Sequence, residues 1–400
     1  SNQEDRETME KRKLGKSGIE FAPIAFGGNV FGWTADEATS HRLLDAFVDA
    51  GFSFIDTADV YSRWYPGNKG GESEAIIGTW LKKNPAKRAK VQIATKCGMV
   101  PAEGALKRDH IKWSVDESLK RLNTDYVDLF QSHKDDKATP LEETLSTYGE
   151  LVKAGKIRAI GASNYDAPRL AEAARISREK GLPRYESLQP HYNLVERGLF
   201  EGALEDECLK EGIGVIPYYS LASGFLSGKY RSEADVGEAK RAAGVKKYIN
   251  PKGLGVLKAL DEVSKKHNVD NTQVTLAWLL QRKSITAPIV SATRLEQLKD
   301  IIPIIRSGKG SLTVGYNRRF SPAAKAASKF FAGRSMPLHL VMSMNAGVIP
   351  SEHWTQDMES GGGRIIGESC HLIDLAAFLT GSRPVEVYAQ AIGPVQRNTD

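Results

Sequence analysis

Between Phe21 and about Ile305, short apolar runs alternate with longer stretches of helical periodicity. The apolar runs are rich in β-branched and aromatic residues, and they lie at residues 21–28, 52–58, 90–96, 126–133, 157–163, 185–190, 214–219 and 285–292. Such alternation is typical of strand–helix units that build a parallel sheet. Eight units favour a (β/α)8 barrel over an open doubly wound sheet, which usually has fewer strands and a glycine-rich first turn.

The segments around these runs predict further local structure. Residues 139–142, Thr-Pro-Leu-Glu, have the spacing of a capping box with proline at the first helical position. Asp166 is expected to cap a helix that stops at Gly181. Residues 11–20 are expected to form a hairpin that closes the bottom of the barrel. A glycine-rich, charged insertion at residues 222–252 lies on the face where barrel active sites form.

The pattern changes near residue 306, which is the predicted end of a barrel domain that starts at residue 10. A linker at residues 307–311 precedes a small α+β fragment at residues 312–400. The expected strands of this fragment are 312–317, 338–344 and 385–391, and its expected helices are 321–333 and about 366–381. This is a small set for an independent sheet domain.

The composition is that of an ordinary globular protein, with 41% hydrophobic and 26% charged residues in a chain of 400. No apolar run is long enough for a transmembrane helix, and the polar start does not resemble a signal peptide. Residues 1–9 are interpreted as a tag or disordered leader. Three scattered cysteines are too few for a disulfide framework, so we expect a cytoplasmic protein.

The charge pattern argues against nucleic acid as a partner. The net charge of +6 does not come from a basic tail, although residues 301–351 contain seven Lys or Arg and no Asp or Glu. A solvated face on a connecting segment explains this local excess, so neither nucleic acid nor a membrane is expected to bind.

Polar side chains stand at or just after the carboxyl ends of six predicted strands. They are Asp56, Tyr61, Lys96, His133, Ser163, Asn164, Gln189 and Tyr218. Because the carboxyl ends of barrel strands meet at one face, we expect these side chains to line one polar mouth.

Four of these residues form a set suited to acid–base chemistry. The Lys96 ammonium is expected to lower the pKa of the Tyr61 phenol from its ordinary value near ~10, and Asp56 is expected to neutralise the buried lysine. A neutral His133 can orient a substrate oxygen. The set suits proton donation to a carbonyl oxygen as hydride reaches the carbon. No metal is expected, because no His or Cys pairs have ligand spacing.

Five separated motifs occur in order along the predicted barrel. They are Asp-Thr-Ala-Asp-Val-Tyr at 56–61, Ile-Ala-Thr-Lys at 93–96, Asp-Leu-Phe-Gln-Ser-His at 128–133, Gly-Ala-Ser-Asn at 161–164 and Leu-Gln at 188–189. In these motifs the chain resembles the aldo-keto reductases, over about residues 10–305. The resemblance implies that the chain reduces aldehydes or ketones to alcohols with a nicotinamide cofactor.

The resemblance also implies roles for single residues. Tyr61 matches the general acid, Lys96 and Asp56 match the pair that tunes its pKa, and His133 matches the residue that orients the carbonyl. The implied cofactor contacts are Ser163, Asn164 and Gln189 for the nicotinamide carboxamide, Tyr218 for stacking on its ring, Leu221, Gly224 and Lys229 for the pyrophosphate, and Ser291, Arg294 and Gln297 for the 2′-phosphate. Arg294 favours NADPH over NADH, because a guanidinium binds phosphate well.

Some of these assignments have alternatives. Tyr218 can instead pack in the core, with Tyr219 as the competitor for stacking, and Arg294 can be a solvated residue at a helix start. Asp300-Ile301 departs from the Glu-Asn with which many family members touch the adenine. The expected walls of an aromatic substrate pocket are Phe31, Trp33 and Trp64, for which ordinary loop packing is the alternative.

Residues 314–322 and 361–374 resemble the C-terminal domain of the glucose-fructose oxidoreductase and inositol dehydrogenase family. There, His371 would match an active-site histidine. No Gly-x-Gly-x-x-Gly motif follows a strand, so the nucleotide domain of that family is not found in the sequence. We therefore interpret the tail as a partial domain and the chain as a fusion or recombined protein. Its incomplete sheet offers an edge for oligomer formation.

Three functional hypotheses follow. The first is an NADPH-dependent carbonyl reductase, or alcohol dehydrogenase, that acts on a small carbonyl substrate. The second is a cofactor-binding barrel scaffold with little or no turnover. The third is a sugar dehydrogenase that uses the tail.

Overall fold

The computed structural model describes residues 9–237, 242–298, 301, 321–334, 336, 338–342 and 370–381. The chain divides into two compact units, Ser1–Leu312 and Thr313–Asp400. Within the described residues, no helix is both long and apolar enough to cross a membrane.

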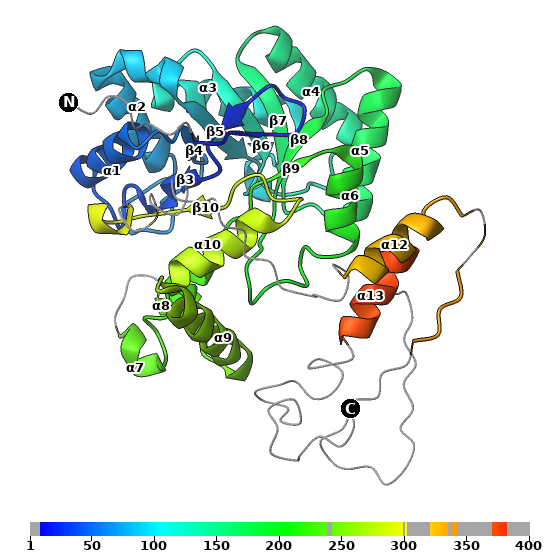
Figure 1. The fold of residues 1–400 in the computed structure, drawn as a ribbon. Coiled ribbons are helices and arrows are strands. Elements are labelled where there is room, and N and C mark those ends of the chain that lie inside the picture. The colour runs from blue at the N-terminus through cyan, green and yellow to red at the C-terminus, as the bar shows by residue number, and fades with distance from the viewer. Residues whose placement is uncertain are drawn as a thin grey trace, which may run out of the picture. The chain divides into compact units, whose positions relative to one another are not determined.

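Eight parallel strands form the centre of the first unit (Figure 1). Their order across the sheet is β10-β3-β4-β5-β6-β7-β8-β9. The strands are β3 (Ala25–Gly27), β4 (Phe54–Asp56), β5 (Gln92–Cys97), β6 (Val127–Ser132), β7 (Ile157–Ser163), β8 (Tyr185–Gln189), β9 (Gly214–Val215) and β10 (Ile289–Val290). Val215 also bridges to Ile285, which joins β9 to the segment before β10. The predicted (β/α)8 barrel is confirmed, and each strand overlaps a predicted apolar run.

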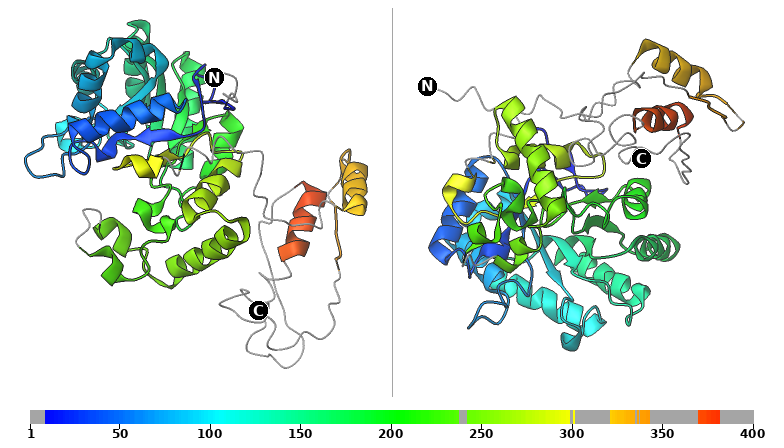
Figure 2. Two further views of the ribbon diagram at one scale, coloured as in Figure 1. Left: turned by 60° about the vertical axis from the view of Figure 1, so that its left-hand side comes forward. Right: turned by 90° about the horizontal axis from the view of Figure 1, so that it is seen from below.

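Helices surround this sheet on its outer side, as both views of Figure 2 show. The principal ones are α1 (Glu37–Asp49), α2 (Glu72–Lys83), α3 (Arg108–Leu122), α4 (Leu141–Lys153), α5 (Ala167–Lys180), α6 (Ala203–Glu211), α9 (Pro251–His267) and α10 (Asn271–Gln281). Apart from α9, their apolar faces pack on the strands in one continuous hydrophobic cluster. The strands are therefore buried on both sides, as a parallel sheet requires.

One of the two predicted helix starts is confirmed. Asp166 accepts a hydrogen bond from the Arg169 amide at 2.9 Å, and α5 ends at Gly181, which has a φ of 65°. The predicted capping box at residues 139–142 is wrong. Pro140 occupies the cap position of α4 without a side-chain bond, because the Thr139 hydroxyl donates instead to Asp136 at 2.5 Å.

The predicted hairpin before the barrel is present. Strand β1 (Arg12–Lys13) pairs antiparallel with β2 (Glu20–Phe21). Leu14 and Ile19 lie between the two strands and pack with inward-facing strand residues of the barrel, such as Phe54 and Leu129. The hairpin therefore supplies the apolar side chains that fill this part of the barrel interior.

The insertion between β9 and β10 is largely helical. It contains η4 (Ala222–Ser227), α7 (Glu233–Val236) and α8 (Ala242–Lys246), which pack against α9 in a separate hydrophobic cluster. The described part of this insertion therefore has a small hydrophobic core of its own.

In the second unit, the structure describes two helices. Helix α12 (Pro322–Phe331) is capped by Ser321, and α13 (Cys370–Thr380) ends at Gly381, in agreement with the predicted helices. Residues 338–342 have no regular structure, so the strand predicted at 338–344 is not formed there. The linker at 307–311 and the strands predicted at 312–317 and 385–391 lie outside the described residues.

Candidate active site

The Lys96 ammonium joins three residues at the carboxyl ends of β4 and β5. Its Nζ donates to Asp56 Oδ2 at 2.7 Å, to the Thr57 carbonyl at 2.8 Å and to the Tyr61 hydroxyl oxygen at 2.8 Å. The lysine side chain is fully buried. All three donor positions of the ammonium are thus used, which is the condition for keeping a charge in a buried site.

A tight turn after β4 places Tyr61 over this lysine. The Thr57 amide donates to the Ala94 carbonyl at 2.8 Å, and the Asp59 amide donates to the Lys96 carbonyl at 3.1 Å. These bonds continue the pairing with β5 beyond the strand itself. The turn therefore holds the phenol in place through the backbone, and Lys96 Nζ lies 4.5 Å from the centre of the Tyr61 ring.

Two glutamines hold the other oxygen of Asp56. Gln131 Nε2 and Gln189 Nε2 donate to Asp56 Oδ1 at 3.1 and 2.9 Å. Gln131 lies in one of the five sequence motifs, but no role is predicted for it from the sequence. The alternation of side chains along β6 could have predicted that Gln131 lies at the site. Gln131 is two residues from both Leu129 and His133, and residues at this spacing in a strand lie on one face.

His133 stands beside the phenol as a neutral ring. The two ring centroids are 6.0 Å apart, and His133 Nδ1 is buried without a hydrogen-bond partner among the described residues. Burial, together with the nearby Lys96 charge, holds the pKa of this imidazole well below its ordinary range. At neutral pH the ring therefore carries one N–H and no charge.

The expected effect on Tyr61 is wrong in direction. Burial, with the negative charge of Asp56 as the next cause, raises the pKa of the phenol well above its ordinary value. The physical reason is that burial penalises the charged phenolate, and the Asp56 carboxylate adds repulsion. Tyr61 therefore keeps its proton at neutral pH, which suits a proton donor.

A cavity of about 1030 Å³ opens at this face of the barrel. Small-molecule sites commonly have about 300 to 1,000 Å³, so the cavity has room for a large ligand. Predicted site residues that line it are Asp56, Tyr61, Trp64, His133, Ser163, Asn164, Gln189, Tyr218, Leu221, Gly224, Lys229, Ser291, Arg294 and Gln297. Lys96 lies behind Tyr61 and is fully buried.

One wall of the cavity is a network of polar side chains next to an aromatic ring. The Tyr218 hydroxyl donates to Asn164 Oδ1 at 2.8 Å, and Asn164 Nδ2 donates to the His133 carbonyl at 2.9 Å. The Tyr218 ring stacks on His191, with centroids 5.3 Å apart. Tyr219 is 46% exposed and has a φ of 54°. Tyr218 is thus the tyrosine tied to the predicted amide-binding residues.

Two basic side chains, Lys229 and Arg294, also line the cavity. Amide, hydroxyl and aromatic groups line it as well, so the donor set fits a dinucleotide, which carries phosphates and a flat ring. Gln297 Oε1 accepts from the Thr293 amide at 2.8 Å and therefore shapes this loop. Ile301 also lines the cavity, whereas Asp300 lies outside the described residues.

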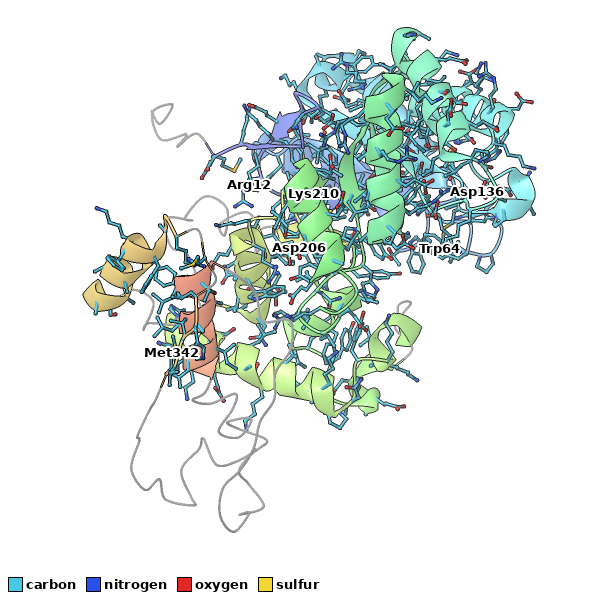
Figure 3. All side chains as sticks on the ribbon, turned by 90° about the vertical axis from the view of Figure 1, so that its right-hand side faces the viewer. Arg12, Trp64, Asp136, Asp206, Lys210 and Met342 are labelled. Carbon is cyan, nitrogen blue, oxygen red and sulfur yellow. The ribbon has the colours of Figure 1, made fainter. Side chains whose placement is uncertain are left out.

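The three aromatic residues predicted to wall a substrate pocket have different places. Trp64 lines the cavity and is 51% exposed, at the periphery of the barrel (Figure 3). Trp33 packs edge-on against Trp64 at 5.6 Å and supports it from outside the lining. Phe31 is wrong as a wall residue, because it is fully buried and stacks on Phe26 in the hydrophobic core.

The turn that carries Tyr61 also contains a carboxyl with an unusual pKa. Asp59 Oδ1 is buried and has no hydrogen-bond partner among the described residues. Burial, and then the neighbouring charge of Glu74, raises the pKa of Asp59 to about 7. Because this pKa is above that of the unfolded chain, near ~4, the stability that the protonated carboxyl contributes should be lost as pH rises from about 4 to about 7 and should level off above that.

We expect Asp59→Asn to become more stable than wild type, by an amount that grows with pH. Between pH 5 and pH 8 the gap in unfolding free energy should widen by about 2 kcal/mol, because only the wild type loses a favourable proton over that range. Urea unfolding of both proteins at each pH measures the gap. A gap that stays constant or narrows would contradict this assignment.

Among the described residues, no group of His, Cys, Asp or Glu is arranged to hold a metal ion.

The comparisons with known proteins are consistent with the geometry. The sequence model described as "Aldo/keto reductase family" matches residues 23–307. The match leaves out most of the tail, and it includes every strand of the barrel.

Curated relatives match about three quarters of the chain. A Bacillus subtilis protein named "Uncharacterized oxidoreductase YrpG" is 33% identical over 310 residues, which is 74% of this chain and 91% of the relative. The L-glyceraldehyde 3-phosphate reductase of Escherichia coli K12 is 30% identical over 319 residues, covering 77% of this chain and 90% of that enzyme. Protein tas of the same strain is 30% identical and covers 73% and 91%.

Proposed function

The chain belongs to the aldo/keto reductase family, and we propose that it reduces aldehydes or ketones to alcohols with NADPH. The observation that carries the proposal is the contact of Lys96 Nζ with both Asp56 and Tyr61, next to a cavity that is also lined by the basic side chains of Lys229 and Arg294. In the overall reaction the carbonyl compound takes up a hydride from NADPH and a proton, and NADP⁺ and the alcohol leave.

The side chains divide the proton chemistry between them. The carbonyl oxygen binds beside the Tyr61 hydroxyl and the neutral ring of His133, whose N–H donates a hydrogen bond as negative charge builds on that oxygen. Tyr61 then gives its proton to the oxygen, and the Lys96 ammonium at 2.8 Å stabilises the phenolate that remains. NADPH, when bound, supplies the hydride. Solvent returns the proton to Tyr61 after the alcohol leaves.

The cavity wall supports a position for the cofactor. Ser163 and Asn164 face it beside Gln189 and offer hydroxyl and amide groups to a carboxamide, next to the Tyr218 ring on which a nicotinamide can stack. The Gln189 amide already donates to Asp56, so we propose that it contacts the cofactor with its remaining capacity while it positions the carboxylate. Lys229 and Arg294 are proposed to bind the pyrophosphate and the 2′-phosphate.

The proposed function is tested by mixing the protein with NADPH and a panel of aromatic and aliphatic aldehydes. The absorbance of the reduced nicotinamide should fall in proportion to the alcohol formed. Tight NADPH binding without turnover of any aldehyde on a broad panel would overturn the proposal and favour a cofactor-binding scaffold.

Arg294→Gln should weaken NADPH binding selectively. The loss of one charged contact to a phosphate corresponds to a rise of about ten- to a hundredfold in KM for NADPH, whereas KM for NADH should change by less than about threefold. Steady-state kinetics with both cofactors measure this. Arg178→Gln is the matched control, because Arg178 pairs with Glu211 away from the cavity. Equal effects on both cofactors would contradict the role of Arg294.

Other expectations remain predictions. Residues 308–400 lie outside the family match. Three predictions concern this tail: its resemblance to a partial glucose-fructose oxidoreductase domain, the origin of the chain as a fusion, and oligomer formation through the tail. Cytoplasmic location is also a prediction.

A further inference from the structure

The charged side chains along the cavity leave one cation without a role in the proposed function. Among the described lining residues, Arg63, Lys229 and Arg294 are the arginines and lysines, and Asp56 is the one carboxylate. Asp56 is neutralised by Lys96 at 2.7 Å. Lys229 and Arg294 are assigned to the cofactor phosphates, so Arg63 is the lining cation to which the proposed function gives no role.

Arg63 is held at the substrate side of the cavity by its neighbours in the chain. It follows Tyr61 by two residues, and its amide donates to the Val60 carbonyl at 3.1 Å. Val60, Trp64, Met99 and Val100 line the same cavity. These side chains are apolar or aromatic, and the Trp64 ring centre is 6.1 Å from that of Tyr61. The cavity lining therefore combines this guanidinium with apolar and aromatic side chains.

The ion pair that Arg63 makes leaves it available to a ligand. Its Nη1 lies 2.5 Å from Glu103 Oε1, and the two side chains are 45% and 43% exposed. Exposed ion pairs contribute about 0 to 1 kcal/mol, so exchanging Glu103 for another anion costs little. The guanidinium also has five N–H donors, and a carboxylate or phosphate can bind two of them side by side.

We propose that Arg63 binds an anionic group of the substrate, and that the preferred substrates are aldehydes that carry a carboxylate or a phosphate beyond an apolar spacer. The carbonyl group would lie at Tyr61 and His133, the spacer against Trp64 and Met99, and the anion at Arg63. This inference rests on the proposed function and adds the substrate class to it.

The test compares an anionic aromatic aldehyde with a neutral one in each of two pairs. The carboxylate pair is para-formylbenzoate and its methyl ester, and the phosphate pair is para-formylphenyl phosphate and para-methoxybenzaldehyde. In wild type, kcat/KM for at least one anionic aldehyde should exceed that of its neutral counterpart about tenfold or more at low ionic strength, and salt should reduce the ratio. The pair with the larger ratio identifies the group that the site prefers.

Three variants show whether Arg63 causes this ratio. In Arg63→Met the ratio should fall to about one, whereas in Glu103→Gln it should rise, because the competing carboxylate is gone. Arg108→Met is the matched control: Arg108 pairs with Glu150 at similar exposure, 45% and 42%, and does not line the cavity. Its ratio should equal that of wild type.

The inference is overturned by a wild-type ratio near one, or by a ratio that Arg63→Met leaves unchanged or that Arg108→Met changes equally. Turnover of neutral aldehydes in such a result would leave the proposed function standing. If no aldehyde is turned over, the proposed function fails, and calorimetry with the NADP⁺-loaded protein then decides: para-hydroxymethylbenzoate should bind about tenfold more tightly than its methyl ester, and equal affinities contradict the role of Arg63.

Discussion

Replacing Tyr61 with phenylalanine should lower kcat for aldehyde reduction by about 10³-fold, within the range of 10² to 10⁴ typical of a lost general acid. The ring remains in place over Lys96, but it no longer has a proton to give to the carbonyl oxygen. Burial raises the pKa of the Tyr61 phenol well above its ordinary value, so in wild type this proton is present at neutral pH. Single-turnover loss of nicotinamide absorbance measures the effect.

The control for this variant is cofactor binding. The affinity of Tyr61→Phe for NADPH, followed by quenching of protein fluorescence, should stay within about threefold of wild type, because the phosphate-binding residues are unchanged. A variant that keeps a tenth or more of the wild-type rate would show that another group supplies the proton. The nearest alternative is His133, whose ring centre is 6.0 Å from that of Tyr61.

Lys96→Met should remove both activity and stability. Without the ammonium, the phenolate left by proton transfer has no cation at 2.8 Å, so kcat should fall about 10²- to 10⁴-fold. The substitution also leaves the Asp56 carboxylate buried and unpaired, which costs about 3–5 kcal/mol of unfolding free energy. Steady-state rates and urea unfolding measure the two losses.

A double variant separates the two effects. Lys96→Met combined with Asp56→Asn removes both charges, so most of the lost stability should return while the rate stays low. Both glutamine amides at Asp56 Oδ1 can still donate to the amide oxygen of an asparagine, provided that this oxygen takes the same place. If stability does not return, the loss in the single variant comes from packing. If activity returns with it, Lys96 has no part in the chemistry.

The sequence was sufficient for the barrel and for the meeting of Asp56, Tyr61 and Lys96. Each strand is a short apolar run, and parallel strands in a closed barrel must end at one face. Asp56 ends β4, Lys96 lies in β5, and Tyr61 follows within one turn. Asp56 and Lys96 are the charged residues of β4 and β5, so no other charged residue of these two strands can take their place at the site.

Other features depend on contacts that local pattern does not contain. Phe31 follows η1 (Gly28–Val30), a turn that returns its ring to Phe26 in the core. The capping box failed because Asp136 engages the Thr139 hydroxyl. The direction of the Tyr61 pKa shift depends on the burial of the phenol and on the position of Asp56. The place of Arg63 in the cavity lining likewise depends on the tertiary structure.

Direct hydride transfer from NADPH to the carbonyl carbon is tested most directly with a labelled hydrogen atom. The protein is mixed with an aromatic aldehyde and with NADPH that carries deuterium at the transferring position of the nicotinamide, and the alcohol is analysed by mass spectrometry. The alcohol should carry one deuterium on the carbinol carbon for each NADPH consumed. Bound NADPH that is not consumed, or an alcohol without deuterium, would contradict it.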